Sequence, residues 1–72
     1  MQIESLKVFC DLAESKSFTK AALANQVTQS AVSQQISSLE RLFKARLIER
    51  SKRKFNLTRQ GRVLYNHGKQ VL

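Results

Sequence analysis

The chain has 72 residues, of which 42% are hydrophobic, with two glycines, no proline and a formal net charge of +8 at pH 7. A chain of this length builds one small domain around one core, and this composition excludes a fibre or a disordered linker. No apolar run approaches the roughly 20 residues that cross a bilayer, and residues 1–20 lack the pattern of a secretory signal. We therefore expect a cytoplasmic protein with no membrane segment.

The positive charge is concentrated in the second half of the chain. Residues 41–72 contain ten of the 13 Lys and Arg residues against Glu49 alone, a balance of +9, whereas residues 1–40 have a balance of −1. Such asymmetry favours a polyanionic partner, which means nucleic acid or, less often, an anionic membrane surface.

The first predicted element is a buried helix over residues 3–14, where Ile3, Leu6, Cys10 and Ala13 recur at helical spacing. Cys10 is the one cysteine of the chain, which excludes an intrachain disulfide and a multi-cysteine metal site. We expect it to be a reduced thiol packed in the core.

Two further helices are predicted around a tight turn. Thr19 is the expected N-cap of a short helix over residues 20–25, and Phe18 is expected to pack against Leu23. Val27 is the expected buried residue of the turn, and Thr28 then caps a longer helix that runs to residue 43. Two capped helices joined by a tight turn predict a helix-turn-helix unit.

Beyond residue 43 the hydrophobic period changes from helical to alternating. Residues 47–49 and 54–57 predict two short strands, with Phe55 and Leu57 on one face and a basic tip at residues 50–53. Thr58 is the expected cap of a last helix from Arg59 onward. The predicted fold is mainly α: a winged helix-turn-helix with a three-helix core and a two-stranded β wing over residues 1–58, then the start of a C-terminal helix over residues 59–72.

The stretch "TQSAVSQQIS", residues 28–37, contains no charged residue. At 100° per residue its Gln and Ser side chains fall within an arc of about 140°, roughly opposite an apolar face. Gln and Ser both donate and accept hydrogen bonds, as reading base edges requires. The polar arc consists of Gln29, Ser30, Ser33, Gln34 and Ser37, and the apolar face of Val32, Ile36, Leu39 and Phe43.

Other residues are expected to bind the phosphate backbone of the DNA. Phosphate contacts supply most of the sequence-independent affinity for DNA, and an arginine also fits a narrow minor groove. The amides at the helix start after Thr28 are suited to a phosphate. The expected basic contacts are Arg50, Lys52, Arg53 and Lys54, with Arg46 and Arg59 nearby.

Other function classes are weaker. One His, one Cys and one Asp, with no glycine-rich phosphate loop, predict neither an enzyme nor a cofactor or metal site, and His67 is expected to be a surface or dimer-contact residue. The basic residues 44–62 leave an anionic membrane or a partner protein as an alternative, but they surround a hairpin pattern and form no amphipathic helix. RNA binding lacks the exposed aromatic residues that stack on unpaired bases.

The runs "FTKAALANQVTQSAVSQQISSLERLF", "RLIERS" and "NLTRQG" resemble the N-terminal winged helix-turn-helix domain of LysR-type transcriptional regulators, and the match covers nearly the whole chain. The resemblance implies a bacterial regulator that binds double-stranded DNA sequence-specifically, as a dimer on an inverted-repeat site. A helix like residues 28–43 would lie in the major groove, and a wing like residues 50–54 would lie on the backbone or minor groove. By position, Gln29, Ser30, Ser33 and Gln34 match the residues that such regulators direct at DNA.

The resemblance also implies a role for the last helix, and a further domain after it in such regulators. That helix would begin the linker that pairs two subunits, and its expected seam consists of Val63, Leu64, Val71 and Leu72. The effector-sensing domain that binds a small molecule is expected to be missing from this chain. The sequence departs from the family pattern at Ser30, where many members have proline, at Asn25 and Ile48, and at Lys44. Because a glycine commonly ends the recognition helix at the position of Lys44, we expect either a longer helix or a strained end.

Overall fold

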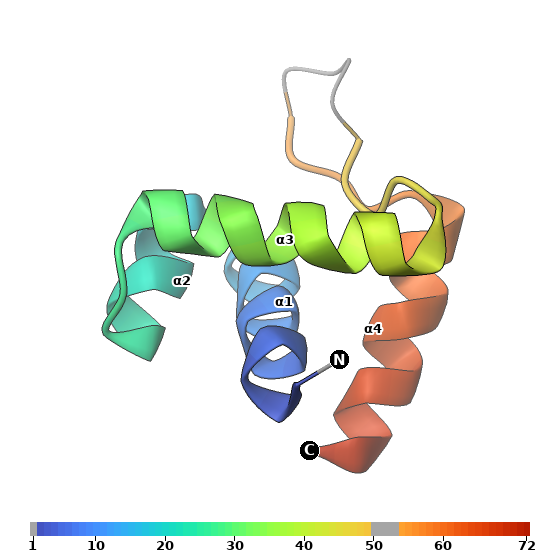
Figure 1. Cartoon of the computed structure of the whole chain (residues 1–72), viewed down its shortest axis with the longest axis horizontal. Helices are drawn as coiled ribbons and strands as arrows, with labels where there is room; N and C mark the ends of the chain where they lie inside the picture. The colour runs from blue at the N-terminus through green and yellow to red at the C-terminus, as the bar shows by residue number, and fades with distance from the viewer. Residues whose placement is uncertain (1, 50–53) are drawn as a thin grey trace.

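The computed structural model describes residues 2–49 and 54–72, and this part of the chain contains four helices. They are α1 (Ile3–Ser15), α2 (Phe18–Asn25), α3 (Gln29–Phe43) and α4 (Arg59–Val71). α3 crosses over α1, with α2 near one end of α3 and α4 descending from the other end (Figure 1). The described parts of the connection between α3 and α4 rise on the side of α3 that faces away from the other helices (Figure 1).

The core is centred on α1, which packs against each of the other three helices. The predicted first helix is confirmed, although Ile3 at its start is 59% exposed. Cys10 is a free thiol buried in this core, as expected, and burial raises its pKa. The buried apolar residues are Leu6, Val8, Phe9, Cys10, Leu12, Ala21, Ala22, Val32, Ile36, Leu39, Leu47 and Ile48.

Two of the three predicted helix caps are confirmed. The hydroxyl of Thr28 accepts the amide of Ala31, and that of Thr58 accepts the amide of Gly61, each at 3.0 Å. The cap of α2 is Ser17, whose hydroxyl accepts the amide of Lys20 at 3.1 Å, so the helix starts before Thr19 and the prediction there was wrong.

The expected packing around α2 was also wrong. Leu23 is 74% exposed, and Phe18 instead meets Phe55 edge to face, with ring centroids 6.5 Å apart. Val27 is 37% exposed, so it is not the buried residue of the turn. Phe18 therefore connects α2 to the base of the wing, a contact that joins residues 37 positions apart in sequence.

Three helices end at a residue other than glycine in the left-handed conformation. Lys16, Gln26 and Lys44 follow α1, α2 and α3 with φ angles of 57°, 55° and 53°. This conformation costs an ordinary L-residue about 1 kcal/mol or more relative to glycine. Of the two outcomes expected for Lys44, the structure shows the strained end, because α3 stops at Phe43.

The two strands predicted for the wing, residues 47–49 and 54–57, are reduced to a single bridge in the described residues. Within residues 44–49 and 54–58 the structure forms one isolated antiparallel bridge, between Ile48 and Leu57, and the amide of Glu49 donates to the carbonyl of Asn56 at 2.8 Å. The neighbouring amides of Leu47 and Ile48 donate to the carboxylate of Glu40, at 2.8 and 3.4 Å. The predicted basic tip at residues 50–53 lies outside the described residues.

Gly61 fixes the start of α4 against the base of the wing. A Cβ atom built on Gly61 would lie 2.1 Å from the carbonyl oxygen of Leu47, and the amide of Thr58 donates to that same oxygen at 3.0 Å. The backbone of α4 approaches so closely that only glycine fits. The orientation of the wing relative to α4 is thereby fixed by backbone contacts.

Candidate nucleic-acid interface

The outer face of α3 is polar and exposed, while its inner face is buried. Val32, Ile36 and Leu39 are buried as the helical spacing predicts, but Phe43 is 44% exposed and so does not belong to the core. Phe43 is exposed at the C-terminal end of α3, which extends beyond α1 (Figure 1). The predicted reading residues are all exposed along one helix: Gln29, Ser30, Ser33, Gln34 and Ser37.

The N-terminal end of α3 is connected to the start of α2. Nε2 of Gln29 donates to Oγ1 of Thr19 at 2.6 Å, and both residues are exposed. A glutamine amide carries two N–H donors and one acceptor oxygen, so this bond orients the side chain and uses one donor. Gln29 therefore keeps one N–H donor and its acceptor oxygen for a base edge, while the bond to Thr19 orients its side chain.

Two adjoining polar hollows lie along the outer face of α3. They share Ser37 and Arg41, and Nη2 of Arg41 donates to Oγ of Ser38 at 3.3 Å. The first hollow, about 360 Å³, is lined by Ser33, Gln34, Ser37, Ser38 and Arg41. The second, about 420 Å³, is lined by Ser37, Glu40, Arg41, Lys44, Ala45 and Arg46.

Sequence reasoning missed Arg41 and Lys44 as candidate interface residues. The helical spacing alone could have identified Arg41, because at about 100° per residue it falls within the polar arc, between Ser30 and Gln34. No such signal existed for Lys44, whose position depends on the left-handed end of α3.

The wing residues named from the sequence are only partly placed. Lys54 is exposed, as are Arg46 and Arg59. Nη1 of Arg46 lies 3.6 Å from Oε1 of Glu40, which holds the arginine near the C-terminal end of α3. Arg50, Lys52 and Arg53 lie outside the described residues, so their contact with DNA stays a prediction.

The residues expected at a dimer seam are not all brought together. Val63 and Leu64 line an apolar hollow of about 570 Å³ with Phe43, Leu47 and His67. Val63 is 53% exposed, whereas Leu64 is partly buried against the core. Val71 and Leu72 are exposed near the end of α4 and do not line this hollow.

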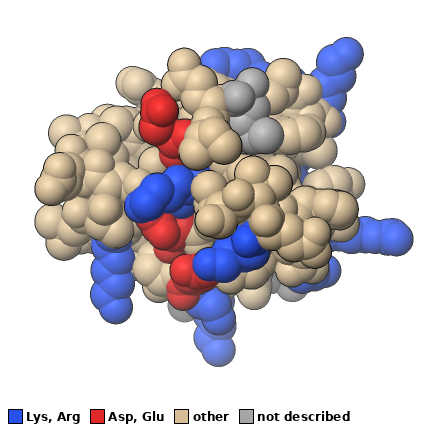
Figure 2. All heavy atoms as spheres, turned by 90° about the horizontal axis from the view of Figure 1, so that it is seen from below, with Lys and Arg blue, Asp and Glu red and all other residues tan. Residues whose placement is uncertain are grey.

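Carboxylates gather on the face of the molecule that points away from α3. Figure 2 shows this face, where acidic side chains form a stripe flanked by Lys and Arg. Three of the five acidic residues of the chain, Glu4, Asp11 and Glu14, belong to α1. This face therefore differs from the outer face of α3, where residues 29–37 carry no charged side chain.

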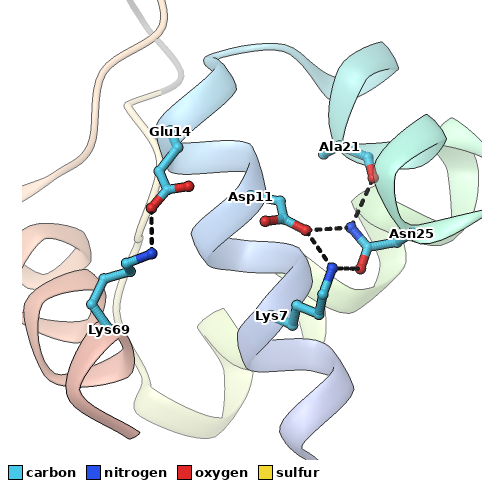
Figure 3. Close-up of polar contacts among 6 residues, drawn as sticks. All are labelled: Lys7, Asp11, Glu14, Ala21, Asn25 and Lys69. Carbon is cyan, nitrogen blue, oxygen red and sulfur yellow. Dashed lines mark hydrogen bonds and ion pairs between the residues drawn. The ribbon is translucent and has the colours of Figure 1, made fainter. Parts of the chain in front are cut away.

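Ion pairs and amide contacts satisfy much of this acidic stripe (Figure 3). Asp11 accepts hydrogen bonds from Lys7 at 2.9 Å and from Asn25 at 2.8 Å. Burial raises the pKa of Asp11, but these two donors outweigh it and the net shift is downward. Asn25 therefore joins α2 to α1 by hydrogen bonds, and its Nδ2 also donates to the carbonyl of Ala21 at 2.9 Å.

Among the described residues, no three His, Cys, Asp or Glu side chains come together in a group that could hold a metal ion. Of the helices in the same part of the chain, none combines the length and apolar character needed to cross a membrane.

Comparisons with known proteins agree with this geometry. The family of bacterial regulatory helix-turn-helix proteins, lysR family, matches residues 3–62. The HTH-type transcriptional regulator CysL of Bacillus subtilis (strain 168) is 39% identical over all 72 residues, which are 24% of CysL, so the chain spans about a quarter of this relative.

Solved structures of DNA-binding domains have the same fold. The BenM domain in complex with catB site 1 DNA has a TM-score of 0.92 and 32% identity, covering 99% of this chain and 80% of that one. The CbnR domain in complex with DNA has a TM-score of 0.89 and 30% identity, covering 99% and 82%. The chain belongs to the LysR family of bacterial regulatory helix-turn-helix proteins.

Proposed function

We propose that this chain is the sequence-specific DNA-binding domain of a LysR-type transcriptional regulator. Residues 1–58 are the winged helix-turn-helix, and residues 59–72 begin the helix that pairs two subunits. The observation that carries the proposal is the outer face of α3, which is exposed, uncharged from Gln29 to Ser37 and rich in groups that both donate and accept hydrogen bonds. The two solved DNA complexes with this fold support it.

The division of labour follows from the chemistry of each surface. α3 enters the major groove, where a glutamine is able to bond N6 and N7 of adenine together and a serine is able to address several bases. The first amides of α3, just after Thr28, are suited to a phosphate. Ser30, Ser33 and Gln34 continue the reading face, while Lys54 and the residues Arg50, Lys52 and Arg53 hold the backbone or minor groove.

Pairing of subunits is proposed for the apolar side of α4. Val63 and Leu64 lie beside the exposed Phe43, and Val71 and Leu72 are exposed further along the same segment. A second copy that covers these residues would place two α3 helices on the two halves of an inverted repeat. Binding of a small-molecule effector belongs to the part of a full-length regulator that this chain does not span.

The test is a fluorescence-anisotropy titration against an interrupted AT-rich inverted-repeat duplex, a scrambled duplex and anionic vesicles, at two salt concentrations. We expect salt-sensitive binding to both duplexes, tighter on the inverted repeat. Binding to vesicles alone would overturn the proposal in favour of a membrane-surface role. Equal affinity for both duplexes would contradict the assigned site and the dimer while leaving DNA binding intact.

A further inference from the structure

We propose that the basic cup formed by Ser37, Arg41, Lys44 and Arg46 at the C-terminal end of α3 binds one backbone phosphate of the duplex. This inference rests on the proposed function and adds a contact to it. The cup would be a second holding site, built from residues other than those of the predicted wing tip, and it acts on the same helix that reads the bases.

The composition of the cup fits a phosphate. Of the residues that line this hollow of about 420 Å³, three are cationic, Ser37 supplies a hydroxyl and Glu40 is the one carboxylate. Oε2 of Glu40 is bonded to the amide of Leu47 at 2.8 Å, and Oε1 lies 3.6 Å from Arg46. The carboxylate thus bonds to the base of the wing, and the lining keeps an excess of cationic residues, three against one carboxylate.

Spacing along α3 places the cup at the edge of the major groove. Arg41 lies about 18 Å along the helix axis from Gln29, at 1.5 Å per residue, whereas the major groove is about 12 Å wide. A helix that crosses the groove with Gln29, Ser33 and Gln34 against base edges would carry its C-terminal end beyond the groove. The groups met there are phosphates, which a guanidinium or an ammonium is suited to bind.

The backbone of Lys44 adds a separate argument. Lysine occupies a left-handed position where glycine costs less, although Lys16 and Gln26 do the same at other helix ends. Lys44 differs from these two residues because it lines a hollow together with Arg41 and Arg46. Cations near a helix C-terminus also stabilise the helix dipole, and this simpler explanation predicts a change in stability without a change in DNA binding.

Lys44→Asn and Lys44→Arg separate the two explanations. Asparagine tolerates the left-handed conformation and removes the charge, while arginine keeps the charge at the same backbone position. We measure anisotropy with the inverted-repeat and scrambled duplexes over several salt concentrations, and thermal unfolding of every variant. Lys16→Asn, at the equivalent end of α1, is the stability control for the change of backbone residue.

We expect Lys44→Asn to weaken binding to both duplexes alike, by about tenfold, and to lower the salt slope by about one, because phosphate contacts carry no sequence information. Lys44→Arg should retain both affinity and slope. Arg41→Gln should behave as Lys44→Asn does. If the wild type binds DNA and Lys44→Asn matches it in affinity and slope, the cup is not a phosphate site, whereas a wild type that binds neither duplex overturns the proposed function together with this inference.

Discussion

The carboxylate of Glu40, buried near the end of α3, accepts a hydrogen bond from the backbone amide of Leu47 at 2.8 Å. The amide of Ile48 donates to the same oxygen at 3.4 Å. One side chain thus joins the proposed recognition helix to the base of the wing. Glu40 therefore links α3 to the base of the wing, the two elements that we propose to contact DNA.

Glu40→Gln should destabilise the domain. An amide offers one acceptor oxygen where the carboxylate offers two, and the buried amide of Leu47 loses a charge-assisted bond. We expect the free energy of unfolding to fall by about 1–3 kcal/mol, measured by denaturant titration. Glu4→Gln, an exposed change on α1, is the control and should remain within about 0.5 kcal/mol of the wild type. Equal effects at both positions would show that Glu40 does not hold the wing.

Gly61→Ala and Gly68→Ala should differ although both remove a glycine from α4. At Gly61 the added Cβ meets the carbonyl oxygen of Leu47 at 2.1 Å, and backbone yields poorly. At Gly68 it meets the side chains of Leu6 and Cys10 at 2.9 and 3.0 Å, which are able to move. Gly61→Ala should cost about 3 kcal/mol or more, whereas Gly68→Ala should cost about 1 kcal/mol or less, because alanine also favours the helix. Thermal unfolding of the two variants decides the comparison, and a reversed order would contradict the packing of α4.

Thr19→Val should relax the base preference that we assign to Gln29. The hydroxyl of Thr19 holds the amide of Gln29 at 2.6 Å, and valine keeps the shape of threonine without that acceptor. We expect discrimination at one base pair to fall by several-fold, because each good bidentate contact contributes about 1–3 kcal/mol and a freer side chain retains only part of it. Binding to a panel of single-base variants measures the change, and Thr19→Ser should preserve the wild-type preference. An unchanged panel for Thr19→Val would show that Gln29 leaves Thr19 when it binds DNA.

Gln26→Gly should stabilise the domain. Gln26 holds a left-handed backbone at the end of α2, with its amide bonded to the carbonyl of Leu23, and glycine adopts this conformation without a steric cost. The expected gain is about 1 kcal/mol, which raises the unfolding temperature by about 4–8 °C for a domain of this size. Gln26→Ala keeps the steric cost and should show no such rise in the same thermal scan.

The sequence predicted those features that depend on neighbours along the chain. Thr28 and Thr58 were identified as caps because each precedes a helical pattern directly, and the polar face of α3 followed from the helical period alone. The cap of α2 was misplaced because Ser17 and Thr19 are equally good local candidates. With Ser17 as the cap, α2 begins at Phe18, whose ring meets that of Phe55 far along the chain.

The basic cup and the short wing base could not be predicted for the same reason. The amide of Leu47 bonds to the carboxylate of Glu40, and Arg46 lines the same hollow as Arg41 and Lys44, just beyond the left-handed end of α3. Each of these features joins residues across a change of chain direction. A pattern read along one helix or strand contains no signal for such a contact.

The stability of the domain should fall at acid pH through Glu14. Lys69 at 2.8 Å and the hydroxyl of Tyr65 at 2.8 Å both donate to Oε2 of Glu14, and these bonds hold the pKa of the carboxyl below its ordinary value of 4.5. The unfolded chain therefore takes up this proton at a higher pH than the folded chain does. The contribution is fully present above about pH 4.5 and is lost as the pH falls through the lowered pKa of the folded state.

Glu14→Gln isolates this contribution, because it removes the titrating group and keeps an acceptor oxygen. Thermal unfolding between pH 7 and pH 3 should show the wild type more stable than Glu14→Gln at neutral pH, with the difference shrinking as the pH approaches 3. Lys69→Gln should lose only part of the pH dependence, since Tyr65 still donates to Glu14. A constant difference between wild type and Glu14→Gln across this range would mean that the contact between α1 and α4 does not depend on the charge of Glu14.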